Sequence, residues 1–240
     1  MTDGPLGPFP DDWQRALAVM AHPDDMEYGG AAAVAAWTRA GKQVVYLLLT
    51  RGEAGIDTMA PAEAARVRVH EQRASAAVVG VEEVEFLDHP DGTLTYGLDL
   101  RRDIAAAIRR HRPEVVLATN HRETYGGTYL NMADHRIAGQ ATIDAVRDAG
   151  NRWVFTDLAD GGLEPWSGVK HLAVVASPQS THAVDVTDTF GLGVESLKAH
   201  AAYLHGLGDP DPEEFLRGGA EAVAERFGGR LGVSFEMLGI

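Results

Sequence analysis

Short apolar runs alternate with alanine-rich segments along this chain, and that alternation limits the possible folds more than any other feature. Runs with the length of buried strands are Leu17–Met20, Val44–Thr50, Val84–Leu87, Val115–Thr119 and Leu172–Ala176. Segments with helical spacing between them are Gly30–Ala40, Ala62–Val79, Leu100–His111 and His135–Ala149. We therefore expect an α/β fold, with a mostly parallel, Rossmann-like sheet flanked by helices.

The chain is long enough for one α/β domain with a sizeable core. It has 240 residues, of which 45% are hydrophobic. No internal repeat or linker requires a second domain, so we expect a Pro-, Gly- and Asp-rich extension at residues 1–14 and a single domain at residues 15–240. In the C-terminal third we expect a strand pair, Leu172–Ala176 with Ala183–Val186, a helix at about 193–204, and an irregular end.

The charge balance disfavours several classes of partner. The chain has 35 acidic and 21 basic residues and a formal net charge of -14, which would repel nucleic acid and anionic lipid. The longest apolar stretches fall far short of the about 20 residues that span a bilayer. Residues 1–13 lack the basic and apolar regions of a secretory signal, so a cytoplasmic location is expected. Without cysteine, any metal must be held by histidine and carboxylate.

Polar side chains gather directly after the first apolar run, at His22, Asp24, Asp25 and Glu27. Sites in parallel sheets lie beyond the carboxyl ends of the strands, which is where this segment would turn into a helix. His22 and Asp25 are three positions apart and can converge on one point. With His135 they would supply the three ligands of a catalytic zinc, and this donor set also suits ferrous iron. Acidic residues are common at helix starts, so the pattern alone only suggests a metal hydrolase.

Several motifs carry a resemblance to a known family. Residues 21–27, Ala-His-Pro-Asp-Asp-Met-Glu, match the signature AHPDDxE in full, and residues 49–53 are similar to a second block. Further similarities are an R-x-x-E helix from Arg68, a loop over residues 87–92, and the Asp134-His135 pair. On these motifs the chain, from about residue 17 to about 205, resembles the LmbE-like, or PIG-L, family of zinc-dependent N-acetylglucosaminyl deacetylases.

The resemblance implies removal of an N-acetyl group from an amino sugar or glycoconjugate. It places zinc on His22, Asp25 and His135. It also makes Asp24 the general base that takes a proton from the attacking water. We therefore expect a small N-acetylated sugar as the substrate.

Sugar binding is a second implication of the resemblance, which points to Glu53, Arg68 and Asp91 as groups for sugar hydroxyls. A loop charge, a helix-face ion pair and a turn residue are their structural alternatives. The loop at residues 122–131 is long enough to line a pocket. Its tyrosines can stack on a sugar ring or simply anchor the loop.

The chain departs from the family pattern at Met132, where members typically have the histidine that binds the oxyanion or acts as the acid. Methionine cannot do this chemistry. Our first candidate to replace it is His182, beside a strand in the C-terminal third. The second is His121, which leaves the strand Val115–Thr119 at the expected site edge. The alternative functions are a catalytically impaired zinc- or sugar-binding relative, or an amidase for another small N-acyl substrate.

Other enzyme classes find little support in the sequence. Neither a G-x-G-x-x-G motif nor a P-loop is present, so a nucleotide-binding oxidoreductase is disfavoured. The G-x-S-x-G elbow of serine hydrolases is also missing. The sequence leaves open the sugar conjugate, the acyl group and the assembly of the chain as a homo-oligomer.

Overall fold

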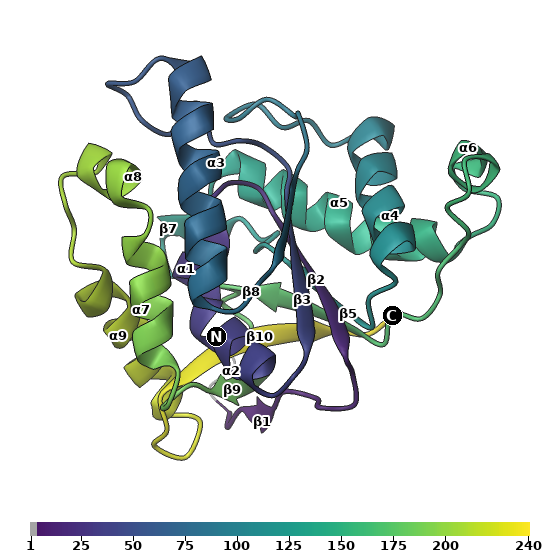
Figure 1. Ribbon diagram of the computed structural model, residues 1–240. Coiled ribbons are helices and arrows are strands. Elements are labelled where there is room, and N and C mark those ends of the chain that lie inside the picture. Colours follow the sequence, from purple (N-terminus) through teal and green to yellow (C-terminus); the bar gives the residue numbers. More distant parts are fainter. Residues whose placement is uncertain (1–3) are drawn as a thin grey trace.

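The computed structural model describes residues 4–240, and a sheet of eight strands runs through their centre (Figure 1). The strands lie in the order β1-β9-β10-β8-β5-β2-β3-β4. Their bounds are β1 Gly7–Pro8, β2 Arg15–Met20, β3 Gln43–Leu48, β4 Glu83–Phe86, β5 Val115–Ala118, β8 His171–Val175, β9 His182–Asp185 and β10 Gly232–Leu238. Every pairing is parallel except those of β10 with β8 and with β9. The expected mostly parallel α/β fold is confirmed.

Helices cover both faces of this sheet (Figure 1). Their bounds are α1 Asp25–Gly29, α2 Ala31–Arg39, α3 Pro61–Val78, α4 Leu98–His111, α5 Ala133–Gly150, α6 Thr156–Asp160, α7 Phe190–Lys198, α8 Ala201–Gly206 and α9 Pro212–Ala224. A small hairpin, β6 Thr124–Gly126 and β7 Tyr129–Leu130, stands apart from the sheet. No helix within residues 4–240 has the length and hydropathy to cross a membrane.

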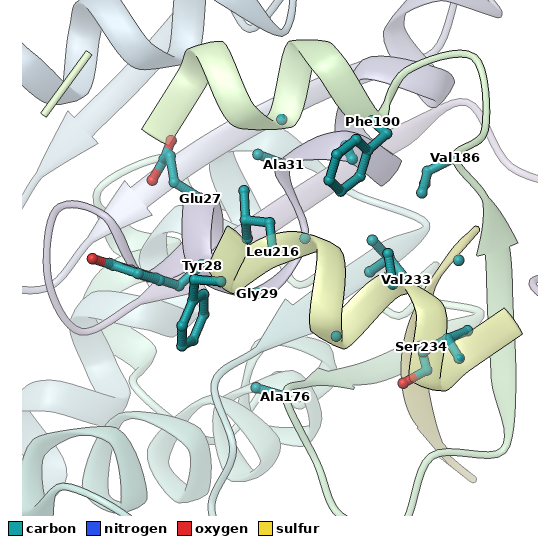
Figure 2. Close-up of a pocket in the computed structure, with 18 residues that line it drawn as sticks. Glu27, Tyr28, Gly29, Ala31, Ala176, Val186, Phe190, Leu216, Val233 and Ser234 are labelled. Atoms are coloured by element: carbon teal, nitrogen blue, oxygen red, sulfur yellow. The ribbon is translucent and has the colours of Figure 1, made fainter. Parts of the chain in front are cut away.

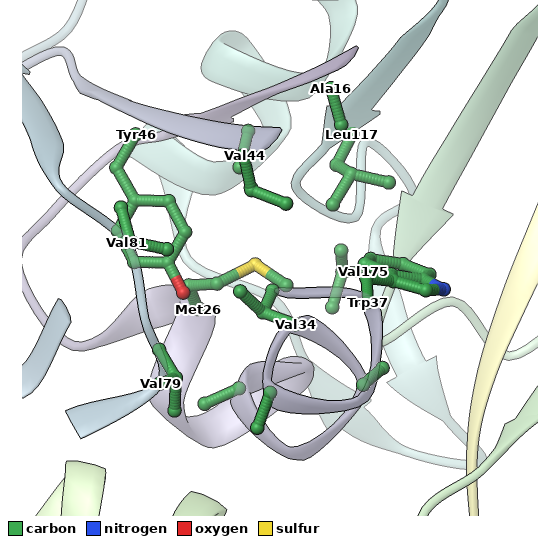
Figure 3. Packing of buried hydrophobic residues seen from close by; sticks show 14 of the residues in the cluster. Ala16, Met26, Val34, Trp37, Val44, Tyr46, Val79, Val81, Leu117 and Val175 are labelled. Atoms are coloured by element: carbon green, nitrogen blue, oxygen red, sulfur yellow. The ribbon is translucent and has the colours of Figure 1, made fainter. Parts of the chain in front are cut away.

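Alternation of side chains along the central strands produces two separate cores. On β2, Ala18 and Met20 point into one cluster of buried residues, whereas Leu17 and Val19 point into the other. The first cluster packs α2 and α3 against the sheet (Figure 3), and the second packs α4 and α5 against the opposite face. Burial on both faces explains why these strands are continuous apolar runs in the sequence.

The C-terminal third differs from the expectation. The helix expected at about 193–204 is two helices, α7 and α8, that are separated at Ala199 and His200. The end expected to be irregular contains α9 and β10. Because β10 inserts between β8 and β9, the strands expected to pair with each other do not. Val233, Phe235 and Met237 alternate along β10 and reach the first core, a period-two signal that we missed.

The N-terminal segment also joins the fold. β1 pairs in parallel with β9, and Phe9 and Trp13 are buried in the first core, where both rings contact Trp37. Residues 7–13, expected as part of an extension, therefore belong to the sheet and its core.

Candidate metal centre

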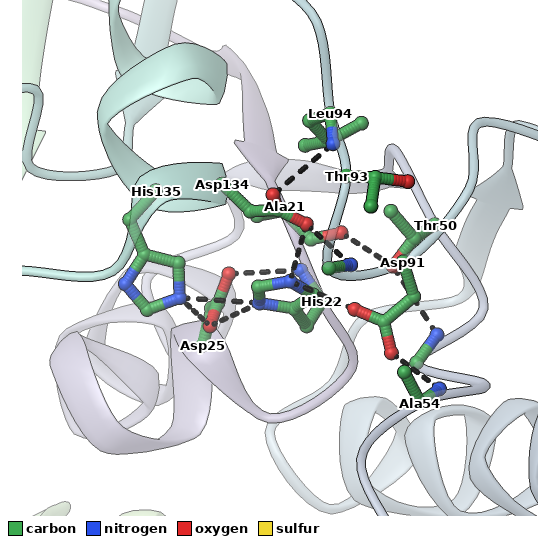
Figure 4. Close-up of polar contacts among 12 residues, drawn as sticks. Ala21, His22, Asp25, Thr50, Ala54, Asp91, Thr93, Leu94, Asp134 and His135 are labelled. Atoms are coloured by element: carbon green, nitrogen blue, oxygen red, sulfur yellow. Dashed lines mark hydrogen bonds and ion pairs between the residues drawn. The ribbon is translucent and has the colours of Figure 1, made fainter.

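Three side chains from distant parts of the chain meet at the carboxyl edge of the sheet (Figure 4). His22 follows β2, Asp25 begins α1, and His135 lies in the first turn of α5. The Nδ1 atom of His22 is 3.1 Å from Nε2 of His135 and 3.6 Å from Oδ1 of Asp25. Nε2 of His135 is in turn 2.9 Å from Oδ1 of Asp25. The structure thus brings together the three residues that the sequence predicts as metal ligands.

The spacing of these donor atoms fits a zinc ion. Tetrahedral coordination at about 2.0–2.1 Å places neighbouring donors about 3.3 Å apart, in the middle of the measured range. Burial acts to raise the pKa of Asp25, but the imidazoles of His135 and His22 outweigh it and hold this pKa well below its usual value. Asp25 is therefore kept as the carboxylate that a cation requires.

Two carboxylates hold the opposite edge of the His22 ring (Figure 4). Nε2 of His22 lies 3.1 Å from Oδ1 of Asp91 and 3.3 Å from Oδ2 of Asp134. Asp134 is itself held, because its carboxylate accepts the backbone N–H groups of Gly92, at 2.7 Å, and Leu94, at 3.1 Å. A carboxylate that binds one ring nitrogen directs the other toward the metal. His22 is therefore oriented with Nδ1 toward the other two ligands.

Changing Asp134 to asparagine is expected to weaken zinc binding by about 10–100-fold, the usual cost of losing a carboxylate behind a histidine ligand. The three ligands would remain, but the ring of His22 would lose a charged partner. Competition with a fluorescent zinc chelator measures the change, and unchanged affinity would show that Asp134 does not orient the ring.

The second imidazole of the centre is oriented by different groups. Nδ1 of His135 lies 3.2 Å from Oδ1 of Asn131 and 2.5 Å from the hydroxyl of Tyr125. Asn131 is buried, and its amide donates to the backbone carbonyls of Asn120 and Arg122. Our sequence reasoning missed Asn131; the available signal was an amide four positions before His135.

Asp24 lies between the two ligands of the motif and adopts an unusual backbone conformation. Its φ of 91° is left-handed, which costs a residue other than glycine about 1–3 kcal/mol and is often found at functional sites. Burial raises the pKa of its carboxyl to about 6, an effect that the Arg68 guanidinium opposes and the Asp25 charge reinforces. A carboxyl with a pKa near neutrality suits a general base.

The residues expected to bind sugar are engaged within the protein. Arg68 is only 2% exposed; it donates to the backbone carbonyl of Pro23 at 2.5 Å, and its Nη2 lies 3.1 Å from Oδ2 of Asp24. Glu53 accepts the N–H of Asp91 at 2.9 Å. Arg68 therefore holds the turn that carries Asp24. Sugar binding by Glu53, Arg68 and Asp91 stays a prediction.

The two histidines expected to replace Met132 lie in other surroundings. His182 is within 2.9 Å of the Thr181 hydroxyl, and its ring packs beside Gly7 on β1. His121 lies against Gly139 of α5, and its pKa is lowered by burial and by Arg122. Within residues 4–240, neither ring has a hydrogen bond or ion pair with Asp24 or the three ligands. Sheet pairing draws His182 toward β1, so the structure does not support it as the replacement.

The polar groups near Asp24 include hydroxyls that our sequence reasoning missed. Tyr203, on α8, stacks its ring 4.0 Å below the guanidinium of Arg68. Burial and the Asp24 charge raise the pKa of this tyrosine above its usual value. The same two causes raise the pKa of Tyr28. Both side chains therefore stay neutral and can donate hydrogen bonds near the base.

A mostly apolar cavity of about 170 Å³ lies beside α1 (Figure 2). Residues of α1, α7, α9 and β10 line this cavity. Two of them, Tyr28 and Phe215, pack edge to face, with their ring centroids 5.3 Å apart. The metal ligands do not line it. The candidate metal centre and this cavity are therefore separate features.

Known proteins resemble this chain in sequence and in structure. The family model described as PIG-L, GlcNAc-PI de-N-acetylase, matches residues 17–146. Diacetylchitobiose deacetylase of Thermococcus kodakarensis is 33% identical over 199 residues, which are 80% of this chain and 71% of the relative. The 1D-myo-inositol 2-acetamido-2-deoxy-alpha-D-glucopyranoside deacetylase of Kineococcus radiotolerans is 32% identical over 201 residues, covering 69% of this chain and 53% of the relative.

A solved structure has the same overall fold. N,N'-diacetylchitobiose deacetylase from Pyrococcus horikoshii superposes with a TM-score of 0.86 at 26% identity, covering 95% of this chain and 84% of the other. The fold and the His-Asp-His group at the sheet edge define an α/β protein with a candidate metal site. Within that class, the chain belongs to the PIG-L family of N-deacetylases.

Proposed function

We propose that this protein is a zinc-dependent hydrolase that removes the N-acetyl group from an N-acetylglucosamine-containing compound. One observation carries the proposal. The donor atoms of His22, Asp25 and His135 lie at distances from one another that suit zinc coordination, next to the buried carboxyl of Asp24. The related deacetylases of diacetylchitobiose and of the inositol-linked sugar support this class of substrate.

The residues around the centre have distinct tasks in this proposal. His22, Asp25 and His135 would hold a zinc ion, which when bound would polarise the amide carbonyl and make water more acidic. Asp24 accepts a proton from the attacking water at its carboxylate, and then returns it to the leaving amine. Because Met132 can donate no proton, Asp24 performs both transfers. Arg68 keeps the Asp24 turn in place, and Asp91 with Asp134 keeps His22 oriented.

Acetate release tests the proposal. Purified protein with one equivalent of zinc is incubated with N,N'-diacetylchitobiose, with an inositol-linked N-acetylglucosamine and with free N-acetylglucosamine. Release from at least one of them, abolished by Asp24→Asn, supports the proposal. If zinc is bound and no acetate appears from any of the three, the alternative of an impaired zinc- or sugar-binding relative is favoured. Elemental analysis of protein purified without added metal distinguishes zinc from ferrous iron.

The activity should fall in acid. Asp24 must be deprotonated to accept a proton, and its pKa is raised to about 6. Zinc beside it would lower that pKa, so the acid limb lies at or below about 6. We expect kcat/KM to drop about tenfold for each pH unit below the limb, in a profile measured at constant zinc occupancy. A rate that is flat from pH 7 down to 4 would contradict this role of Asp24.

A further inference from the structure

Asp24 has a left-handed backbone conformation, and a second helix, α3, contacts its backbone N–H through Gln72. We infer that Gln72, on α3, is a positioning residue that keeps Asp24 in the geometry needed for proton transfer. The inference rests on the proposed function, since it assumes that Asp24 is the base. Nothing in the sequence motifs of the chain points to Gln72.

The amide of Gln72 bridges two parts of the catalytic turn. Its Oε1 accepts the backbone N–H of Asp24 at 2.9 Å, and its Nε2 donates to Oε1 of Glu27 at 3.0 Å. Glu27 also accepts a hydrogen bond from the hydroxyl of Ser75 at 2.6 Å. Gln72, Glu27 and Ser75 are almost completely buried. A flipped amide would put its NH₂ group against another donor, so the carboxylate of Glu27 determines which way Gln72 points.

The backbone N–H of Asp24 depends on this contact. The Asp24 side chain makes no capping hydrogen bond to α1, so the turn does not stabilise itself. A buried N–H group without a partner is costly, and the left-handed conformation is unfavourable for aspartate as well. Arg68, one turn earlier on α3, holds the adjoining carbonyl of Pro23. One helix therefore holds both the C=O and the N–H of the peptide group that joins Pro23 to Asp24.

The experiment compares Gln72→Met with the wild-type protein, both loaded with zinc, on the substrate that gives the most acetate. Methionine fills a similar volume but accepts no comparable hydrogen bond. Because a displacement of about 1 Å at a reacting group can cost about 10²-fold in rate, we expect kcat to fall at least about tenfold. KM and the zinc content should stay within about twofold of wild type, because no ligand is touched.

The matched control is Ser75→Ala, on the same helix and equally buried. It removes a hydrogen bond to Glu27 but leaves the contact between Gln72 and Asp24, so its kcat should stay within about threefold of wild type. If kcat falls equally in Gln72→Met and Ser75→Ala, the buried hydrogen bonds around Glu27 matter only for stability, and the inference is overturned. If Gln72→Met does not fold, Gln72→Asn, whose amide is too short to reach both partners, replaces it.

Amide hydrogen exchange gives a readout that does not depend on activity. The N–H of Asp24 should exchange at least about tenfold faster in Gln72→Met, whereas the N–H of Tyr28, which bonds the Asp24 carbonyl at 3.0 Å within α1, should not change. Unchanged exchange at Asp24, or an unchanged kcat in an active enzyme, overturns the inference. If the wild-type protein releases no acetate while exchange at Asp24 responds as expected, the positional contact stands and the proposed function fails.

Discussion

Replacing Asp24 with asparagine is expected to lower kcat by about 10²–10⁴-fold while zinc remains bound. The amide keeps the shape of the side chain but cannot accept a proton as a base. Asparagine also tolerates the left-handed backbone that Asp24 adopts, so the turn should keep its conformation. Steady-state acetate release and zinc content, measured on the same preparation, give the result.

The choice of asparagine separates chemistry from folding. Alanine at position 24 would add backbone strain at a φ of 91° and leave the nearby guanidinium of Arg68 without any acceptor on this side chain, whereas asparagine keeps an amide oxygen there. A thermal unfolding curve within a few degrees of wild type shows that the Asp24→Asn variant is folded. A variant that keeps more than a tenth of the wild-type kcat would exclude Asp24 as the base.

Changing His135 to alanine should abolish both zinc binding and acetate release. One of three ligands is lost, so the drop in affinity should exceed the about 10–100-fold cost of losing a group behind a ligand. Zinc at 100 times its Kd stabilises the wild-type protein by about 2.7 kcal/mol, an increment that the variant should lack. Thermal unfolding with and without zinc, together with elemental analysis, measures both effects.

The control for this change is His182→Ala, since His182 contacts Thr181 and Gly7 and, within residues 4–240, has no hydrogen bond or ion pair with the three ligands. It should bind zinc as tightly as wild type. Equal zinc affinity in His135→Ala and wild type would mean that the metal is held elsewhere. Reduced affinity in His182→Ala would show that this histidine reaches the centre after all.

The ligands could be predicted because their signal is local. His22 and Asp25 lie three positions apart where a buried strand meets a helix, and the carboxyl ends of parallel strands meet at one edge. The apolar runs were equally readable, because strands that are buried on both faces have no polar alternation. His135 was the candidate third ligand on its residue type, and the resemblance to a family supported it.

The surroundings of those ligands were decided by the tertiary structure. Asp134 meets His22 across 112 positions, and Gln72 meets Asp24 across 48. The sequence suggested His182 as a replacement for the family histidine at position 132. The pairing of β9 with β1 and β10 places it instead beside β1. The residue types at a strand-to-helix turn determine which atoms can bind a metal. Which buried groups orient them depends on how helices pack over the sheet, and a hydrogen bond between distant residues leaves no periodic trace in the sequence.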